Sequence, residues 1–333
     1  MPSADPLKPI QLPGPIVFFG TPDFAIPTLE ALCAEALEPV LVVTQPARAV
    51  GRGRRLVPPP VARRARELGL PVRMIDSVKE SEFQHQIAEL EVWVGLVVAF
   101  GQIFPESLLT IPDAGCINLH ASLLPQYRGA APIQAAIANG DSQTGVSTMR
   151  MTTGLDSGPI LLQEVLTIGS QETTPELAVR LARGGAKLVI RTLRELAAGT
   201  LSPREQDESA MSLAPKLSRR DGDLDWTWPA QKIVNRWRAF TPWPGVAGRF
   251  RDQLIKVRGC RLSEGTAGGA LPGTILDVGV ELRVACGEDT VLVLERLQRP
   301  HRAALDAAAF VNGEHVRVGE RFESGERARG DST

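Results

Sequence analysis

The sequence predicts an α/β protein in which a doubly wound, mainly parallel, Rossmann-like sheet is followed by a small C-terminal, OB-like β-barrel. Two observations lead to this fold class. Over residues 15–199, short apolar, β-prone runs alternate with helical segments, as in a sheet whose strands are joined by crossover helices. Beyond Gly199, short β-prone pieces recur between glycines, which is typical of a small antiparallel barrel.

Strands and helices alternate along most of the first part. We expect strands at the apolar, β-prone runs Ile16–Phe19, Val40–Val43, Val72–Ile75, Val92–Ala99, Gly115–His120 and Val146–Met151. We expect helices at Val61–Leu68, at a stretch that follows a Ser77–Glu80 capping box and ends at Leu90, at Pro132–Ala138 and at Pro175–Ala197. Thr21 or Asp23 is a candidate cap for a further helix after the first strand.

The second part carries the barrel strands, which we expect at Gly248–Phe250, Leu254–Val257, Gly273–Leu276, Glu281–Ala285 and Val291–Leu297. With 333 residues, 43% of them hydrophobic, the chain is long enough for two cores and too apolar to be disordered. The expected organisation is a flexible N-terminus (1–14), a catalytic domain (15–199), a linker (200–216), a C-terminal domain (217–323) and a flexible tail (324–333).

Composition excludes several classes of protein. The first ten residues lack the basic and apolar regions of a secretory signal, and no uncharged apolar run approaches the length of a membrane span. We therefore expect a cytoplasmic protein, without membrane association and monomeric. The four cysteines are scattered without CxxC spacing, which indicates small buried residues rather than disulfides or a metal site.

Two polar side chains end one of the predicted strands. Asn118 and His120 are two residues apart, and side chains alternate along a strand, so the amide and the imidazole point to the same face. Open α/β sheets bind ligands at the carboxyl ends of their strands. Downstream, Asp156 lies between two glycines, a composition typical of a loop whose backbone comes close to a ligand or a facing side chain.

These residue types suit the attack of an amine on a carbonyl carbon. The amide N–H of Asn118 and a protonated His120 are expected to stabilise the oxyanion of a tetrahedral intermediate. Asp156 is expected to keep His120 protonated and to help remove the proton of the amine, directly or through water. No Ser or Cys lies in a nucleophile-elbow context, which favours direct transfer. Purely structural interpretations stay open: a strand Asn that satisfies the backbone, a packed His and a turn-forming Asp.

The segments around these residues resemble the folate-dependent formyltransferases. The similarity is carried by four segments: Val17–Phe24, Asn118–Pro125, Tyr127–Gln134 and Gly154–Gly158. It extends from about Ile16 to Phe322, and Phe240–Gly245 resembles the start of the C-terminal barrel of that family. One departure is Ala121, where the family often has Pro.

The resemblance implies catalytic roles for Asn118, His120 and Asp156, and it implies 10-formyltetrahydrofolate as the formyl donor, without a metal. The folate contacts it implies are Ser122, Leu123, Leu124 and Pro125, together with Phe100, Gly101 and Gln102. The aminoacyl end of the acceptor is expected beside Thr21, Pro22, Asp23 and Phe24, of which Phe24 is an apolar neighbour for methionine or else a core residue.

Arginine distribution indicates which amine receives the formyl group. Eight arginines lie between Arg48 and Arg73 against one acid, although Lys plus Arg (37) and Asp plus Glu (38) nearly balance over the chain. A second basic excess lies between Lys232 and Arg261, and it is suited to phosphates. Such runs are also compatible with ordinary solvated surfaces.

The loop from Gln45 to Leu56 resembles the basic insertion by which tRNA-specific members of the family enter the acceptor stem. We expect tRNA contacts at Arg48, Arg52, Arg54, Arg55, Lys232, Arg236 and Arg249, and Arg52 is the best single candidate. The implied acceptor is the amino group of the methionyl moiety of initiator methionyl-tRNA. The alternatives are an amino sugar nucleotide or other small amine as acceptor, and an RNA- or nucleotide-binding module without catalysis.

Overall fold

The computed structural model describes residues 10–50 and 55–324. Contacts divide the chain into two compact units. Unit 1 comprises Met1–Pro132, Gln143–Thr167 and Ala178–Pro215, and unit 2 comprises Ile133–Ser142, Ile168–Leu177 and Lys216–Thr333. Arg52, Arg54, residues 1–9 of the expected flexible N-terminus and residues 325–333 of the expected tail lie outside the described residues.

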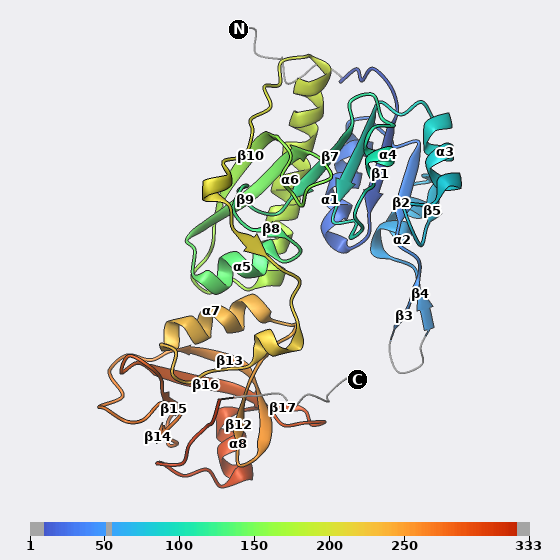
Figure 1. Cartoon of the computed structure of the whole chain (residues 1–333). Helices are drawn as coiled ribbons and strands as arrows, with labels where there is room; N and C mark the ends of the chain where they lie inside the picture. The colour runs from blue at the N-terminus through green and yellow to red at the C-terminus, as the bar shows by residue number, and fades with distance from the viewer. Residues whose placement is uncertain (1–9, 51–54, 325–333) are drawn as a thin grey trace. The chain divides into compact units, whose positions relative to one another are not determined.

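Unit 1 is built on a seven-stranded sheet (Figure 1). In spatial order its strands are β10 (Ile160–Thr167), β9 (Gln143–Arg150), β7 (Cys116–His120), β6 (Val94–Val98), β1 (Ile16–Gly20), β2 (Leu41–Thr44) and β5 (Val72–Met74). The five strands from β7 to β5 are parallel to one another, whereas β9 runs antiparallel to both of its neighbours, β7 and β10. The predicted mainly parallel α/β sheet is confirmed. β10 was not predicted, because it is an edge strand whose second half is polar and largely exposed.

The helices lie between these strands and are α1 (Ile26–Ala34), α2 (Pro60–Glu67), α3 (Ser81–Glu89), α4 (Glu106–Leu109), α5 (Pro132–Asn139) and α6 (Thr174–Ala197). Two predicted caps are wrong. A 3-10 turn, η1 (Asp23–Ala25), precedes α1, and the Thr21 hydroxyl donates to the carbonyl of Phe100 instead of capping a helix. The Glu80 carboxylate accepts from Ser77 N, but this closes a turn before α3.

Helices cover both faces of the central strands. On one face, Val17, Val43 and Val97 pack with residues of α3 and α4 in one core cluster. Asn118 lies beside Val97 in the sheet, so Asn118 and His120 also point to this face. On the opposite face, a Cβ at Gly185 of α6 would come 2.6 Å from Leu119, so a glycine there lets α6 approach β7 closely.

Unit 2 contains an antiparallel six-stranded sheet, and the predicted C-terminal β domain is present as an open half-barrel. Its strands are β12 (Val246–Phe250), β13 (Gln253–Leu262), β14 (Ile275–Asp277), β15 (Leu282–Ala285), β16 (Val291–Gln298) and β17 (Ala304–Asp306). Isolated β-bridges connect the C-terminal segment to both edges of the sheet: Glu323 pairs with Arg249, and Arg321 pairs with Thr274. Two helices that were not predicted, α7 (Ala230–Phe240) and α8 (Ala307–Glu314), pack on β13 and on β15–β17.

The core of unit 2 is aromatic. Phe322 packs between Trp226 and Phe250, with ring centroids 5.3 and 4.9 Å away, and Phe310 lies 6.2 Å from Phe250. The indole N–H of Trp226 donates to the carbonyl of Glu323, which satisfies the polar atom of a buried ring. Within the described residues, no helix has the length and apolar character needed to cross a bilayer.

Candidate active site

The carboxyl ends of the parallel strands bring three predicted segments to one edge of the sheet. The register pairs Gly20 of β1 with Val98 of β6 and Val98 with Leu119 of β7. The segments that follow these strands therefore lie next to one another at the carboxyl edge of the sheet, which is where open α/β folds bind ligands. They are Thr21–Phe24 after β1, Phe100–Gln102 after β6 and Ser122–Pro125 after β7.

His120 is buried and its ring is held at both nitrogens. Nε2 lies 2.9 Å from the carbonyl oxygen of Tyr127, and because a carbonyl only accepts, Nε2 carries a proton and donates it. Nδ1 lies 3.7 Å from Oδ2 of Asp156, an ion-pair distance that is too long for a direct hydrogen bond. Nδ1 is therefore the nitrogen that faces the acid.

Asp156 reaches His120 from a loop that folds back over β7. The loop begins at the end of β9, beside the first residue of β7, where Met151 N donates to Cys116 O at 2.8 Å. His120 is the last residue of β7, so the loop must run back along that strand to reach it. Asp156 adopts a left-handed backbone conformation (φ 45°), and its Oδ2 accepts from the N–H of Gly129 at 2.8 Å. The carboxylate is thus oriented by a backbone donor as well as by His120.

Asn118 is half-buried two residues before His120 on the same face of β7. Among the described residues, its side-chain amide takes part in no hydrogen bond, so its N–H groups are available to a ligand. The structure therefore brings Asn118, His120 and Asp156 together around one small space, although Asp156 is 36 positions from His120 in the chain. No group of three or more His, Cys, Asp or Glu residues in the described part of the chain has metal-binding geometry.

The segment after β7 is fixed by its backbone. Leu124 N donates to Ser147 Oγ, the Ser147 hydroxyl donates to the carbonyl of Ser122, and Gln163 Nε2 donates to the carbonyl of Leu124. The Leu124 side chain packs with Met149 and Ile160, so it faces the protein interior. This leaves backbone atoms and the half-buried Leu123 and Pro125 as the surfaces through which the segment can meet a ligand.

Phe100 and Gln102 are engaged within the protein. The Phe100 ring lies 5.6 Å from the ring of Phe19 in the core, while its carbonyl accepts from Gln45 Nε2 at 2.7 Å. The Gln102 side chain accepts from Val78 N and donates to the carbonyl of Asp76. The next residue, Ile103, was not singled out from the sequence, yet its side chain is 77% exposed at the carboxyl edge of the sheet. The signal in the sequence was the position of this Ile directly after a predicted ligand segment, and its exposure is seen only in the structure.

Thr21–Phe24 forms the turn into η1. The Thr21 hydroxyl bridges the carbonyl of Phe100 and the N–H of Gln45, which ties the ends of three neighbouring strands together. Phe24 is half-buried rather than part of the core, and Pro22 and Asp23 are exposed. The segment thus presents one aromatic surface near the site.

The basic loop after β2 is a β-hairpin rather than an irregular loop. Strands β3 (Arg48–Val50) and β4 (Arg55–Val57) pair antiparallel, and the hairpin projects away from the sheet of unit 1 (Figure 1). Arg48 and Arg55 are exposed, and Arg48 donates to the side chain of Gln45. Gln45 in turn bonds Phe100 O, so one short chain of contacts leads from the hairpin to the segment after β6.

The predicted basic residues of unit 2 differ in their surroundings. Lys232 is exposed and lies over the ring of Trp228. Arg236 stacks on Trp228 and Phe240 and donates to the carbonyl of Asp221, and burial lowers the pKa of its guanidinium. Arg249 is half-buried and donates to the carbonyl of Asp252 at 3.2 Å.

A groove in unit 2 gathers cationic residues that were not predicted as contacts. Among the residues that line it are Arg219, Lys256, Arg258, Arg299 and His301, together with Trp243, whose side chain is 52% exposed. An exposed indole among cations is a combination that suits phosphates and a stacked base. Arg238, counted in the basic excess, is not on this surface, because it is 4% exposed and bonds the carbonyl of Gly169.

The matches to two family models define the class of this protein, the formyl transferases. Residues 15–193 match the formyl transferase family model, and residues 216–315 match the model of the formyl transferase C-terminal domain. Relatives named methionyl-tRNA formyltransferase, from Citrifermentans bemidjiense and Moorella thermoacetica, are 44% and 43% identical to the chain. These matches cover 91% and 92% of this chain and 95% and 98% of the relatives. The chain therefore belongs to the methionyl-tRNA formyltransferase family.

Solved structures of other proteins share the fold. An N-formyltransferase from Helicobacter canadensis, solved with folinic acid and dTDP-3-aminofucose, superposes with a TM-score of 0.65 at 15% identity, over 86% of this chain and 99% of that chain. HypX from Aquifex aeolicus, solved with tetrahydrofolic acid, superposes with a TM-score of 0.59 at 14% identity, over 94% of this chain and 51% of that chain. At this identity the likeness concerns the fold alone.

Proposed function

We propose that the chain transfers the formyl group of 10-formyltetrahydrofolate to the free amino group of the methionyl moiety of initiator methionyl-tRNA, giving N-formylmethionyl-tRNA for translation initiation. The observation that carries this proposal is the meeting of Asn118, His120 and Asp156 in a member of this family. Initiation takes place in the cytoplasm, which is where we place the enzyme. We also propose that the enzyme works as a monomer.

His120 acts through Nδ1 in this proposal. Its Nε2 proton is engaged by the Tyr127 carbonyl, so only Nδ1 can face the reacting carbonyl group. In this proposal an Nδ1–H donor, 3.7 Å from Oδ2 of Asp156, stabilises the negative charge that develops on the carbonyl oxygen. The amide of Asn118 supplies a second donor from the same strand face.

Asp156 has a second task, which is to accept the proton that the attacking amine loses. Its Oδ2 accepts from Gly129 N and faces His120, so the carboxylate is oriented beside the imidazole. The amine's proton passes to it directly or through water, and general-base assistance of this kind contributes about 10²- to 10⁴-fold in rate. The neutral amine attacks the formyl carbon, the bond from that carbon to N10 of the folate breaks, and the proton lost by the amine ends on N10, so that tetrahydrofolate leaves.

The folate is held, in this proposal, by the segments after β7 and β6. The backbone of Ser122–Pro125 is fixed by its bonds to Ser147 and Gln163, so it presents its polar groups to the ligand without reorganisation. The proposed contacts Gly101 and Gln102 lie beside the exposed Ile103, which can cover an apolar ring face. Phe100 contributes indirectly, because its ring lies in the core and supports the backbone of the segment after β6.

The acceptor end and the tRNA body are proposed to contact separate surfaces. The half-buried Phe24, next to Thr21, Pro22 and Asp23, is the proposed neighbour of the methionyl side chain. The β3–β4 hairpin carries Arg48 and Arg55, which suits contact with phosphate backbones, and Arg52 and Arg54 lie between these two residues in the sequence. In unit 2, Lys232, Arg236, Arg249 and the groove around Trp243 are the proposed contacts.

The test uses the purified full chain, 10-formyltetrahydrofolate and charged initiator tRNA, with mass spectrometry of the released amino acid as the readout. N-formylmethionine from the charged initiator, and much less from a charged elongator methionine tRNA, is the expected result. Absence of formyl transfer to the charged initiator contradicts the proposal. Formylation of a dTDP-linked amino sugar in its place supports the alternative acceptor.

A further inference from the structure

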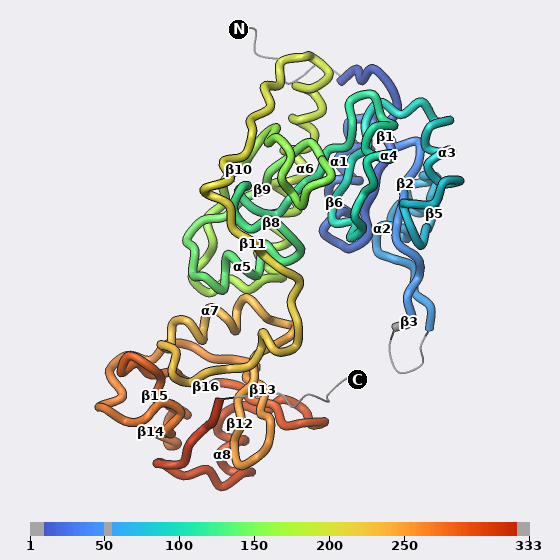
Figure 2. Tube along the Cα trace, in the orientation of Figure 1, coloured from blue at the N-terminus to red at the C-terminus, as the bar shows by residue number. Residues whose placement is uncertain are grey.

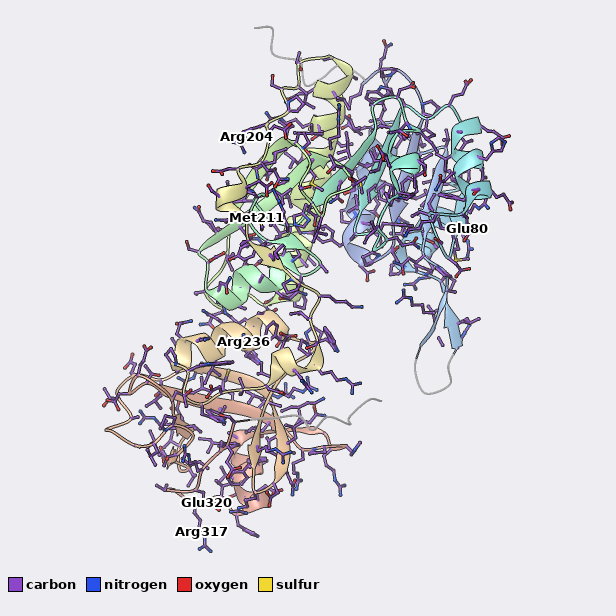
Figure 3. The ribbon with its side chains drawn as sticks, viewed as in Figure 1. Glu80, Arg204, Met211, Arg236, Arg317 and Glu320 are labelled. Carbon is purple, nitrogen blue, oxygen red and sulfur yellow. The ribbon has the colours of Figure 1, made fainter. Side chains whose placement is uncertain are left out.

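The segment that leads from α6 to unit 2 lies against the site rather than spanning open solvent. Arg204 exchanges two backbone hydrogen bonds of 2.8 Å with Ile160, and β11 (Leu213–Ala214) pairs in parallel with β8 (Arg128–Gly129) (Figure 2). Figure 3 marks Arg204 and Met211 along this path. Sequence patterns indicated only a polar linker here, yet its residues contact both loops that orient His120 and Asp156.

Gln206 is the residue of this segment that reaches the Asp156 loop. Its Nε2 donates to the carbonyl of Asp156 at 2.8 Å and to the carbonyl of Gly158 at 2.7 Å, which uses both protons of the amide. Asp156 has φ 45°, a left-handed conformation that is unfavourable for an L-residue and is stabilised by external contacts. Only 9% of Gln206 is exposed, so water competes little for these bonds.

Arg128 fixes which way the amide of Gln206 points. Its Nε donates to Gln206 Oε1 at 3.0 Å, and because a guanidinium only donates, the oxygen must face Arg128 and the NH₂ group must face the loop. The other two nitrogens of Arg128 donate to both carboxylate oxygens of Glu208 at 3.0 and 2.7 Å. This bond holds the pKa of Glu208 below its usual range.

The same three-residue network touches both anchors of the site. Arg128 is 5% exposed and lies between Tyr127, whose carbonyl accepts from His120, and Gly129, whose N–H binds Asp156. Two contacts from Ser212 reinforce it, since its hydroxyl accepts from Tyr127 N and its carbonyl accepts from Arg128 N. A shift of Gln206 or Arg128 would therefore change the separation of His120 and Asp156.

We infer that Gln206, oriented by Arg128 and Glu208, is a positioning residue that sets the distance between Asp156 and His120 in the reactive arrangement. It touches neither the reacting atoms nor a substrate. The inference rests on the proposed catalytic role of Asp156.

The sharpest variant is Gln206→Glu, which keeps the shape and the bond from Arg128 but replaces two donors by a carboxylate oxygen that faces two carbonyls. We expect kcat to fall about 10- to 100-fold, as misplacements of about 1 Å do, with KM for charged tRNA changed by less than about threefold. Gln84→Glu is the matched control, because Gln84 also donates to a backbone carbonyl (Val78) at 3.0 Å but on α3. Its kcat should stay at the wild-type level.

A double-mutant cycle with Asp156→Asn distinguishes positioning from general damage. If Gln206 acts through Asp156, Gln206→Glu should change the residual rate of Asp156→Asn by less than about twofold. A full and equal loss in both backgrounds, or a folded Gln206→Glu protein with wild-type kcat, overturns the inference. Wild-type turnover in Asp156→Asn itself, or no formyl transfer by the wild type, overturns the proposed function instead.

If Gln206→Glu fails to fold, Glu208→Gln carries the test, because the Glu208 side chain is 68% exposed and tolerates the change. Glu208→Gln weakens the hydrogen bonds that hold Arg128 and leaves Gln206 unchanged. The expected result is a kcat loss of about two- to fivefold that disappears in the Asp156→Asn background. An unchanged kcat in folded Glu208→Gln overturns the inference.

Discussion

The imidazole of His120 donates its Nε2 proton to the carbonyl oxygen of Tyr127 over 2.9 Å, which leaves Nδ1 as the nitrogen that faces Asp156. A backbone carbonyl can only accept, so this bond fixes the orientation of the ring. The nitrogen of His120 that is available for chemistry is therefore Nδ1, beside the Asp156 carboxylate.

Replacing the acid should remove turnover without removing binding. Asp156→Asn keeps the shape of the side chain but withdraws the negative charge beside Nδ1 and the acceptor for the amine's proton. We expect kcat to fall about 10²- to 10⁴-fold, with the affinity for charged tRNA nearly unchanged, measured by single-turnover formylation and filter binding. His120→Ala should behave in the same way. Near-wild-type rates in either variant would contradict the assigned roles.

Gly129 should tolerate no side chain. Its φ is 122°, and a Cβ there would lie 2.6 Å from the carbonyl oxygen of Ala214 on β11, so Gly129→Ala must displace the N–H that binds Asp156. We expect at least a tenfold loss of kcat and a lower melting temperature. Gly199→Ala is the control, since Gly199 also has positive φ (66°) but nothing within 4 Å of its Cβ. It should lower the melting temperature slightly and leave kcat unchanged.

The hairpin arginines should bind phosphates. Arg55→Ala removes an exposed cation of β4 and should raise KM for charged tRNA several-fold, with less effect on KM for the folate. The slope of log KM against log salt concentration should decrease by about one, because one phosphate contact is lost. Arg52→Ala should act similarly. Arg191→Ala on α6, where the arginine pairs with Glu195, is the control, and an equal effect there would contradict a specific hairpin contact.

The four thiols should differ sharply in reactivity. Burial raises the pKa of Cys116 and of Cys286 to about 12 and raises the pKa of Cys260 still further, while Cys33 is only partly buried. At pH 8 the three buried thiols are hardly ionised, and the thiolate is the reactive form. We expect one thiol per native chain to react with a disulfide reagent, mapped to Cys33 by mass spectrometry, and four after unfolding. Rapid native labelling of Cys116 would be inconsistent with its burial.

The Arg251–Glu320 ion pair should make the stability of unit 2 depend on pH. Bonds from Arg251 hold the pKa of Glu320 below its ordinary value of 4.5, and Figure 3 labels Glu320 near Arg317, whose N–H also binds it. Because the folded pKa is depressed, the stabilisation is present above pH 4.5 and is lost as the pH falls through the folded pKa. Glu320→Gln should lower the free energy of unfolding by about 1 kcal/mol at pH 7. The difference from wild type should vanish towards pH 3 in urea titrations.

Local sequence patterns determined the alternation of strands and helices, the mainly parallel sheet and the shared face of Asn118 and His120. They could do so because apolar runs and period-two spacing are properties of neighbouring residues. The same patterns missed β10 and α7, whose apolar faces are narrow or interrupted by charges. They also placed Arg238 among surface cations, although tertiary contacts bury it.

Only the tertiary structure decided how the site is held. The bonds from Gly129 to Asp156, from Arg128 to Gln206 and from Tyr127 to Ser212 join residues 27, 78 and 85 positions apart. No local pattern encodes such pairs, because the residues become neighbours only when the strands close the sheet. The sequence therefore determined which side chains are candidates for catalysis. The fold determined the distances between them, which nitrogen of His120 faces Asp156, and the backbone conformation of Asp156.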